Sequence, residues 1–370
     1  MTSNQCLPAS LTSLDVALGA LLTDLAPVTP IELPLAEALG CVAAEMPPLE
    51  VSPSRDIAIA DGWALRSSDL VGASSYSPVP LTNLPVWVEA GDAMPHGCDC
   101  VVAADSVEES GPLLQVLAEA IPGQGVRRAG GAIAAGSIVE AARCIGPLDL
   151  LLARKTGLGK LSVRRPRLRI VNIPATSDET TELICDVARA TGAEVTSAQA
   201  TSRQAPAIAN ALHSKGCDLI VAIGGTGIGR TDATATALVL QGAPIAHGIA
   251  LRPGRTAAVG RIGKIPVIAL PGAPDQALAA WWTLAMPVLN HLSGRKPRPA
   301  LSLPLARKVA SQVGIAEIVL LQRGPELWTP LAVGDLPLEL LARADAWLFI
   351  PASSEGFAAG TAVDAYMLRK

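Results

Sequence analysis

The stretch DLIVAIGGTGIG, residues 218–229, decides the fold class. Residues 218–223 are a short, mostly aliphatic run, which is typical of a strand buried on both faces of a sheet. Gly224–Gly229 is rich in glycine, and Thr231–Leu240 has the apolar spacing of a helix. A buried strand, a glycine-rich loop and a helix in this order predict one unit of an α/β domain with a parallel sheet.

Strand and helix patterns also alternate on both sides of this stretch. Strands are expected at residues 168–173, 193–196 and 267–270, and helices at 180–190 and 202–213. This alternation predicts a doubly wound parallel sheet, which we place in an α/β domain of residues 167–297.

The most apolar segment, residues 277–289, could be mistaken for a membrane span. It is shorter than the ~20 residues that a span needs, and Pro287 interrupts it. A short helix that is apolar on all sides is better explained as part of a buried core. We expect no association with a membrane.

The rest of the chain predicts a multi-domain α/β protein. Apolar spacing over residues 11–46 predicts a helical N-terminal segment. We expect residues 1–50 and 121–166 to form an N-terminal and linker domain. Residues 51–120 read as a small β domain, and residues 298–370 as a β-barrel-like C-terminal domain, because short apolar runs there alternate with Gly, Pro and Asp.

Charge and cysteine content exclude some classes of protein. The net charge of −4 over 370 residues argues against a nucleic-acid-binding protein, which normally carries a basic surplus. Seven cysteines without a regular spacing, and an N-terminus that does not resemble a leader peptide, indicate the cytoplasm.

Two loops are candidates for ligand binding. Gly224–Gly229 and Pro271–Pro274 each follow a predicted strand and precede a helix, at the edge where open α/β sheets bind ligands. Glycines let a backbone approach an anion, and helix N-termini offer N–H groups. Arg252 and Arg255 flank a Pro-Gly turn between these loops and suit an oxyanion. Alternatively, the loops are tight turns without a ligand, and the arginines form a solvated hairpin tip.

Several segments follow the order of motifs in a known protein family. They are SRDIAIADGWALRSSDL (54–70), GDAMPHGCDCVV (91–102), GVRRAGGAIAAGS (125–137), GGTGIGRTD (224–232), LRPGR (251–255) and LPGAPDQA (270–277). These segments resemble motifs of the MoeA/gephyrin family of molybdopterin molybdenumtransferases. Residues 341–351, LARADAWLFIP, resemble a motif near the family's C-terminus. The likeness covers residues 10–295 in order and is weaker beyond them.

The resemblance implies a fold, an activity and ligands. It implies a MogA/MoeA-like α/β domain that binds adenylylated molybdopterin (molybdopterin-AMP), and insertion of molybdate into this pterin with release of AMP. It implies Mg²⁺ as cofactor and a homodimer in which the β domain of one subunit closes the site of the other. A molybdoenzyme or another cofactor-biosynthesis protein is an expected partner.

The resemblance implies site residues at the positions that match the family motifs. Asp61 and Asp232 are expected to be catalytic, and Asp61 is expected to bind Mg²⁺ together with Asp178 or Glu179. The pterin ligand is expected to contact Gly224, Gly225, Thr226, Gly227, Gly229, Arg252, Arg255, Pro271, Gly272 and Pro274.

This sequence departs from the family pattern at three places. Ala90 and Ala132 stand where the family has Thr and Asp, and the loop at residues 174–180 is shortened. Cleavage of a phosphoanhydride needs carboxylates that hold Mg²⁺, so these losses affect chemistry more than binding. The alternative to a transferase is therefore an impaired homologue that binds or delivers molybdopterin or the finished cofactor.

Two further interpretations are possible. A nicotinamide dehydrogenase is disfavoured because no GxGxxG motif follows the first strand of the α/β domain. His96, Cys98 and Cys100 could chelate a soft metal ion, but no second pair of ligands accompanies them.

Overall fold

The structure, a computed structural model, describes residues 5, 7–8, 10–45, 48–110, 113–136, 140–213, 216–242, 244–296 and 299–368. The chain divides into two compact units. Unit 1 comprises residues 1–44, 141–145 and 162–370, and unit 2 comprises residues 45–140 and 146–161. The four-domain boundaries expected from the sequence stay a prediction. Pro297 and Arg298, on which one boundary falls, and Ser137 of the third family motif lie outside the described residues.

A six-stranded sheet is the centre of unit 1. Its strands, in spatial order, are β13 (Glu194–Gln199), β12 (Arg167–Asn172), β14 (Leu219–Ile223), β18 (Ile265–Leu270), β17 (Ala258–Ile262) and β15 (Pro244–His247). The first four strands run parallel, whereas β17 pairs with β18 and with β15 in the antiparallel sense. The expected parallel core is confirmed, and the two antiparallel strands are additional to it.

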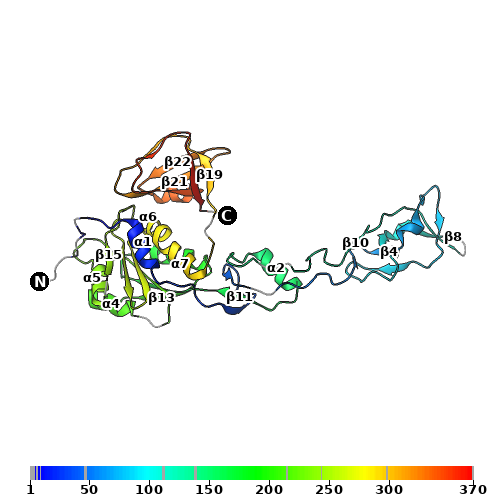
Figure 1. The fold of residues 1–370 in the computed structure, drawn as a ribbon, viewed down its shortest axis with the longest axis horizontal. Helices are drawn as coiled ribbons and strands as arrows, with labels where there is room; N and C mark the ends of the chain where they lie inside the picture. The colour runs from blue at the N-terminus through cyan, green and yellow to red at the C-terminus, as the bar shows by residue number, and fades with distance from the viewer. Residues whose placement is uncertain are drawn as a thin grey trace. The chain divides into compact units, whose positions relative to one another are not determined.

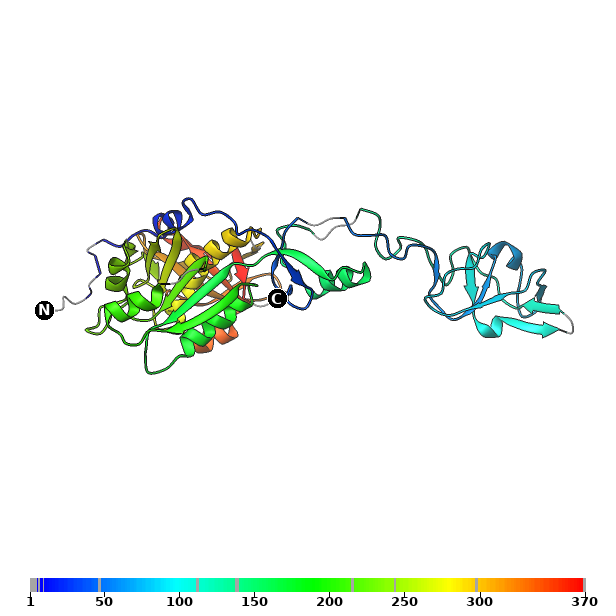
Figure 2. The same cartoon turned by 90° about the horizontal axis from the view of Figure 1, so that it is seen from below.

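Helices cover both faces of this sheet (Figures 1 and 2). One face packs against α1 (Leu14–Leu22), α3 (Glu179–Arg189), α6 (Pro274–Ala280), the π-helical turn η3 (Trp281–Ala285) and α7 (Met286–Ser293). The other face packs against α4 (Ala205–Leu212) and α5 (Thr234–Leu240). The fold is therefore a three-layer α/β arrangement, as the alternation of strands and helices predicts.

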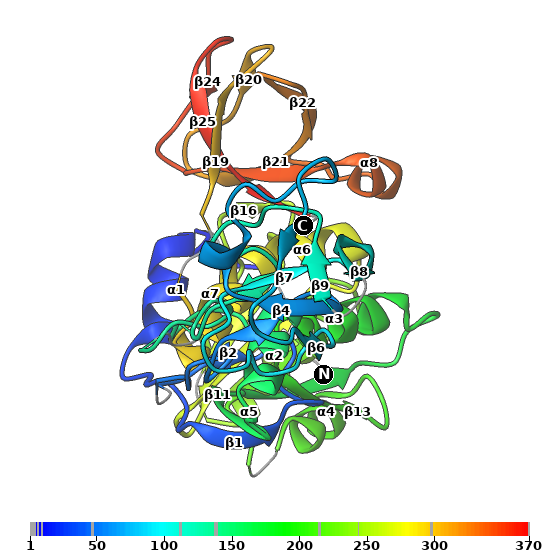
Figure 3. The same ribbon diagram turned by 90° about the vertical axis from the view of Figure 1, so that its right-hand side faces the viewer.

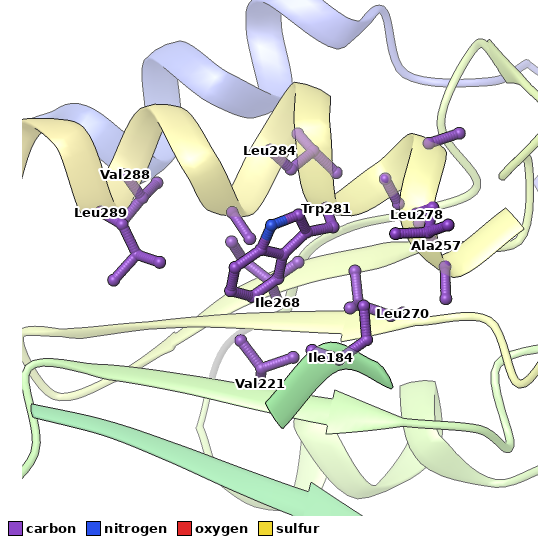
Figure 4. Packing of buried hydrophobic residues seen from close by; sticks show 14 of the residues in the cluster. Ile184, Val221, Ala257, Ile268, Leu270, Leu278, Trp281, Leu284, Val288 and Leu289 are labelled. Atoms are coloured by element: carbon purple, nitrogen blue, oxygen red, sulfur yellow. The ribbon is translucent and has the colours of Figure 1, made fainter. Parts of the chain in front are cut away.

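The apolar segment around residues 277–289 lies in the core, as expected. Trp281 is 1% exposed and packs between the helix and the sheet beside Val221 and Ile268 (Figure 4). Across the described ranges, none of the helices combines the length and the apolar character that crossing a bilayer requires.

The expectation of a helical segment over residues 11–46 is wrong beyond its first third. Only α1 is helical there, and it is followed by strands β1 (Ile31–Pro34) and β2 (Val42–Ala43), which both pair with β11 (Lys160–Arg164). Pro27, Pro30 and Pro34 explain the difference, because proline removes a backbone donor and breaks a helix interior.

Unit 2 is a small β domain with one helix, α2 (Pro147–Lys155). Its main sheet has β4 (Gly62–Leu65) between β6 (Val86–Val88) and β7 (Cys100–Val102). The other strands are β3 (Ile57–Ala58), β5 (Val79–Pro80), β8 (Val107–Ser110), β9 (Leu113–Val116) and β10 (Val126–Arg127), with 3₁₀ turns η1 (Ser67–Leu70) and η2 (Ala104–Ser106).

The C-terminal part of unit 1 is a curled β domain (Figure 3). Its strands are β19 (Leu301–Pro304), β20 (Val309–Ala310), β21 (Ala316–Arg323), β22 (Trp328–Val333), β23 (Ala346–Ile350), β24 (Gly356–Phe357) and β25 (Ala362–Met367), with helix α8 (Leu338–Arg343). Strand β16 (Leu251–Arg252) leaves the α/β domain and pairs with β21. Trp282 also stacks on Trp347 with ring centroids 5.3 Å apart, so the two domains share a packed boundary.

Candidate active site

The two predicted loops lie next to each other at the carboxyl edge of the sheet. Gly224 follows β14 and donates its backbone N–H to the carbonyl oxygen of Leu270, the last residue of β18, at 3.0 Å. A Cβ added to Gly272 would lie 3.5 Å from the Cα of Gly224, so the loops are nearly in backbone contact. The Thr180 hydroxyl of α3 donates to the Gly272 carbonyl oxygen at 2.7 Å and fixes the second loop.

The glycine loop has a tightly determined backbone. Gly224 and Gly225 have φ values of 94° and 66°, in the left-handed region that favours glycine. The Thr234 hydroxyl at the start of α5 donates to the Gly224 carbonyl oxygen at 2.8 Å, and a Cβ on Gly225 would lie 2.5 Å from that hydroxyl oxygen. A side chain at Gly225 is therefore excluded by both conformation and space.

Four successive backbone N–H groups of this loop, those of Gly225–Ile228, make no hydrogen bond with any described residue. Thr226 is only 1% exposed, so its amide is buried as well as unpaired. Buried backbone donors are nearly always paired, and successive free amides form concave sites that bind anions. The loop thus has the features of an oxyanion site.

Asp232 closes the glycine loop on itself and ties it to a second loop. One carboxylate oxygen accepts the Gly229 N–H at 2.9 Å. The other accepts from the Arg203 guanidinium at 2.7 Å, and the same guanidinium donates to the Pro174 carbonyl oxygen at 2.7 Å. Arg203 lies just after β13, so one side chain connects the loops that follow three neighbouring strands. Sequence reasoning missed Arg203, although its place after a predicted strand is a usable signal.

The two predicted oxyanion-binding arginines have different surroundings. Arg252 donates to the carboxylate of Glu317 in β21 at 3.0 Å, and the Ser311 hydroxyl donates to the other oxygen of this carboxylate at 2.5 Å. Arg255 is exposed and has no ion pair within the described part of the chain. Its neighbour Thr256 approaches Thr226 of the glycine loop, with 3.3 Å between the hydroxyl oxygens. Arg255 is therefore the arginine with a free charge beside the loop.

The predicted metal ligands Asp178 and Glu179 lie at the N-terminal end of α3. Asp178 accepts from the side-chain amide of Asn172 at 2.7 Å, and Glu179 accepts from the Ser177 hydroxyl at 3.1 Å. Both carboxylates are exposed, and each keeps one oxygen without a described partner. In the described ranges, no three His, Cys, Asp or Glu side chains are placed so that together they could hold a metal ion. Mg²⁺ often takes only one or two carboxylates beside substrate phosphates, so this pair fits such an ion.

A pocket of about 540 Å³ lies beside these carboxylates, between α3 and the edge strand β13. Its lining is mostly polar and includes Asn172, Asp178, Thr181, Glu182, Cys185, Asp186, Arg189, Ser197, Ala198 and Gln199. Burial raises the pKa of the Cys185 thiol, so the thiol remains protonated at neutral pH. The sequence contained no pattern that predicts this pocket.

Asp61 belongs to unit 2, whereas Asp178 and Asp232 belong to unit 1. The exposed Asp61 carboxylate accepts the backbone N–H of Ala90 at 2.8 Å. Ala90, which replaces a family threonine, therefore contacts the retained acid directly. Ala132 is also in unit 2, where its N–H donates to the Ser52 carbonyl oxygen at 3.0 Å.

The cysteines of unit 2 do not favour a soft-metal site. The Cys100 thiol is buried and donates to the Leu65 carbonyl oxygen, and burial, followed by nearby Asp99, raises its pKa to about 11. Burial also raises the pKa of Cys98. Metal-binding cysteines are thiolates, whereas these two groups are held as thiols.

The site lies within regions that match known families. Residues 12–157 match the MoeA N-terminal region (domain I and II), and residues 170–291 match the probable molybdopterin binding domain. The chain belongs to the MoeA family.

Relatives with curated names are similar over nearly their full lengths. The chain is 27% identical to molybdopterin molybdenumtransferase 2 of Mycobacterium tuberculosis, over 92% of this chain and 95% of that protein. It is 26% identical to the molybdopterin molybdenumtransferase of Synechococcus elongatus, over 84% and 88% of the two chains. The crystal structure of the molybdopterin biosynthesis MoeA protein from Pyrococcus horikoshii covers 98% of this chain and 100% of its own, with a TM-score of 0.70 and 24% identity. The MoeA-type multi-domain α/β fold is thus confirmed.

Proposed function

We propose that this protein inserts molybdate into adenylylated molybdopterin and releases AMP. The observation that carries the proposal is the run of four unpaired amides, Gly225–Ile228, beside Arg255 at the sheet edge. Amides of this kind and a free guanidinium suit the phosphate groups that link the pterin to the nucleotide. The family to which the chain belongs, and the names of its relatives, support this choice of ligand.

The residues have separate roles in this proposal. Gly224–Gly229 and Pro271–Pro274 hold the phosphates, and Arg255 offsets their charge. Asp178 and Glu179 would hold Mg²⁺ beside the phosphates, and the ion would supply neutralisation of their negative charge. Asp232, paired with Arg203, keeps the glycine loop closed while that bond breaks.

In this proposal, Asp61 acts in the site of a second copy of the chain. We place unit 2 of one subunit over the site of the other in a homodimer, so that Asp61 of the partner subunit completes the Mg²⁺ ligands. Exposed apolar side chains in the N-terminal segment, including Val16 and Ile31, are suited to a subunit contact. Light scattering at micromolar concentration should give the mass of a dimer, and a monomer would remove this part of the proposal.

The proposed transferase function also implies a cell compartment and protein partners. Six described cysteines are free thiols, which supports the reducing cytoplasm. A molybdoenzyme, or another protein of cofactor biosynthesis, would receive the product.

One assay tests the function. The full-length protein is incubated with adenylylated molybdopterin, molybdate and Mg²⁺, and AMP release is followed, with molybdate or Mg²⁺ omitted as controls. We expect AMP release that depends on both. Tight binding of the pterin without AMP release would support the alternative, a protein that binds or delivers the cofactor. Absence of binding would contradict both functions.

A further inference from the structure

The N-terminal residue Gln5 inserts its side chain into the glycine loop. Its Nε2 donates to the carbonyl oxygens of Gly227 at 2.6 Å and Gly225 at 3.3 Å. Its Oε1 accepts the backbone N–H of Ala235, in the first turn of α5, at 3.0 Å. Gln5 is only 8% exposed. All the hydrogen bonds of this buried amide thus go to one loop and the helix that follows it, more than 200 positions away in sequence.

The segment that carries Gln5 is attached to the same region by further contacts. The backbone of Thr12 exchanges hydrogen bonds with Gly248 and Ala250, at 2.9 and 2.8 Å. Leu7 and Leu11 pack within 3.1 Å of the position that a Cβ on Gly248 would take. His247, which precedes Gly248, lies with its Nε2 2.9 Å from the Thr226 carbonyl oxygen. The contacts of Leu7, Leu11 and Thr12 therefore attach the segment next to the residues that adjoin the glycine loop.

The geometry of the peptide group links Gln5 to the free amides. In a trans peptide the C=O of one residue and the N–H of the next point in opposite directions. Since the carbonyls of Gly225 and Gly227 point at Gln5, the N–H groups of Thr226 and Ile228 point away from it. Those two amides belong to the run that has no described partner. Gln5 therefore orients the peptide group between Gly227 and Ile228. It shares the peptide group between Gly225 and Thr226 with the Thr234 N–H, which donates to the Gly225 carbonyl oxygen at 3.0 Å.

We infer that Gln5 is a positioning residue for the oxyanion site. A glycine-rich loop has many accessible backbone conformations, and it binds an anion well only if its amides are already oriented. Gln5 contributes to this orientation through two hydrogen bonds to loop carbonyls and one from the first turn of α5, and it does not itself contact the ligand. The identity of the ligand rests on the proposed function, whereas the ordering of the loop does not.

Two substitutions separate hydrogen bonding from packing. Gln5→Ala removes all three bonds. Gln5→Glu keeps the size of the side chain and the acceptor for Ala235, but its carboxylate faces the carbonyl oxygens of Gly225 and Gly227 and cannot donate to them. Gln241→Ala is the matched control, because Gln241 donates to Ala209 between α4 and α5, away from the glycine loop.

Hydrogen exchange of the full-length protein without ligand is the first measurement. In both Gln5 variants the hydrogen-bonded amides within residues 224–235 should exchange about ten-fold faster than in the parent, as expected for the loss of two or three hydrogen bonds. Exchange in β21 should be unchanged in all variants, and Gln241→Ala should leave residues 224–235 unchanged. Unchanged loop exchange in both Gln5 variants would overturn the inference, whatever ligand the protein binds.

Titration with adenylylated molybdopterin is the second measurement. Both Gln5 variants should raise the dissociation constant by about ten-fold, and AMP release at saturating ligand should fall much less. If Gln5→Glu binds as tightly as the parent, packing alone accounts for Gln5 and the inference fails. If the parent binds no pterin, the proposed function fails, and the exchange result still decides the role of Gln5.

Discussion

The guanidinium of Arg203 donates to the carboxylate of Asp232 at 2.7 Å and joins the loops after β12 and β14. Asp232 matches a family acid expected to act in catalysis, but here both of its oxygens already have partners, Arg203 and the Gly229 N–H. We therefore propose that Asp232 in this chain holds the loop and that Arg203 acts together with it.

Replacement of Arg203 should loosen both loops. Arg203→Ala leaves the carboxylate of Asp232, which is 17% exposed, without its cation. Loss of a charged hydrogen-bond partner of this kind costs about 1–3 kcal/mol. We expect this decrease in the free energy of urea unfolding, together with weaker pterin binding. Arg189→Ala, at an exposed ion pair on α3, is the control and should change stability by less than about 0.5 kcal/mol. Equal effects of the two substitutions would contradict the assignment.

Gly227 should tolerate no side chain. A Cβ at Gly227 would lie 2.6 Å from the Oδ2 of Asp232, and that oxygen cannot move without losing the Gly229 N–H. Gly227→Ala should therefore lower stability by about 1–3 kcal/mol and weaken pterin binding. Gly19→Ala in α1 is the matched control, since an added Cβ there meets nothing within 4 Å and alanine favours a helix by about 1 kcal/mol. Thermal unfolding should thus shift in opposite directions for the two variants.

The α/β core could be predicted because its signal is local and repeated. Strands β12, β14 and β18 each contain a short aliphatic run, and each is followed by a helix with regular spacing, so they were found near their true bounds. The antiparallel β17 was not found, since residues 258–262 are short and contain Gly260 and Arg261. The prediction of a helical segment over residues 11–46 was wrong beyond α1, because apolar spacing was weighed above three prolines.

Some parts of the candidate site could also be predicted from the sequence, whereas others could not. The glycine loop and its neighbour Pro271–Pro274 can be recognised in the sequence by their composition and by their place after a strand. Gln5 carries no such signal, and Arg203 carries only its place after a predicted strand, because each acts through contacts made only after the chain has folded. Likewise, nothing in the Arg-Pro-Gly-Arg turn distinguishes Arg252, which pairs with Glu317, from Arg255.

Arg252 and Arg255 should give opposite phenotypes. Arg252→Ala leaves the carboxylate of Glu317, whose side chain is 4% exposed, without its cation, so it should lower stability by about 1–3 kcal/mol. Arg255→Ala should leave stability within about 0.5 kcal/mol of the parent. It should weaken pterin binding by about ten-fold or more, since a charge-assisted bond contributes about 1.5–3 kcal/mol. Chemical unfolding and pterin titration of both variants check this, and a stability loss confined to Arg255→Ala would contradict it.

Cys100 should make the stability of unit 2 depend on alkaline pH. Burial raises the pKa of its thiol from 9.0 to about 11, so the folded protein holds a proton that the unfolded chain releases. This contribution is fully present below pH ~9 and is lost as pH rises to ~11. Cys100→Ala should reduce the decline in unfolding free energy over this window, whereas Cys144→Ala should leave it unchanged. A decline of the same size in Cys100→Ala would show that other groups cause it.

Asp61 should matter for chemistry and not for binding. Its carboxylate is exposed, and its one described hydrogen bond comes from the Ala90 N–H. Asp56 is a matched control in the same unit, since its carboxylate accepts the Ala129 N–H at the same distance, 2.8 Å. Asn can replace either acceptor without the charge, so neither Asp61→Asn nor Asp56→Asn should unfold unit 2.

Only Asp61→Asn should abolish AMP release, because few other carboxylates are left to bind Mg²⁺, and its affinity for the pterin should stay within about two-fold of the parent. Higher Mg²⁺ concentrations should partly restore AMP release if the defect lies in metal binding. Full AMP release by Asp61→Asn at low Mg²⁺ would exclude Asp61 as a metal ligand and would leave Asp178 and Glu179 to serve the ion alone.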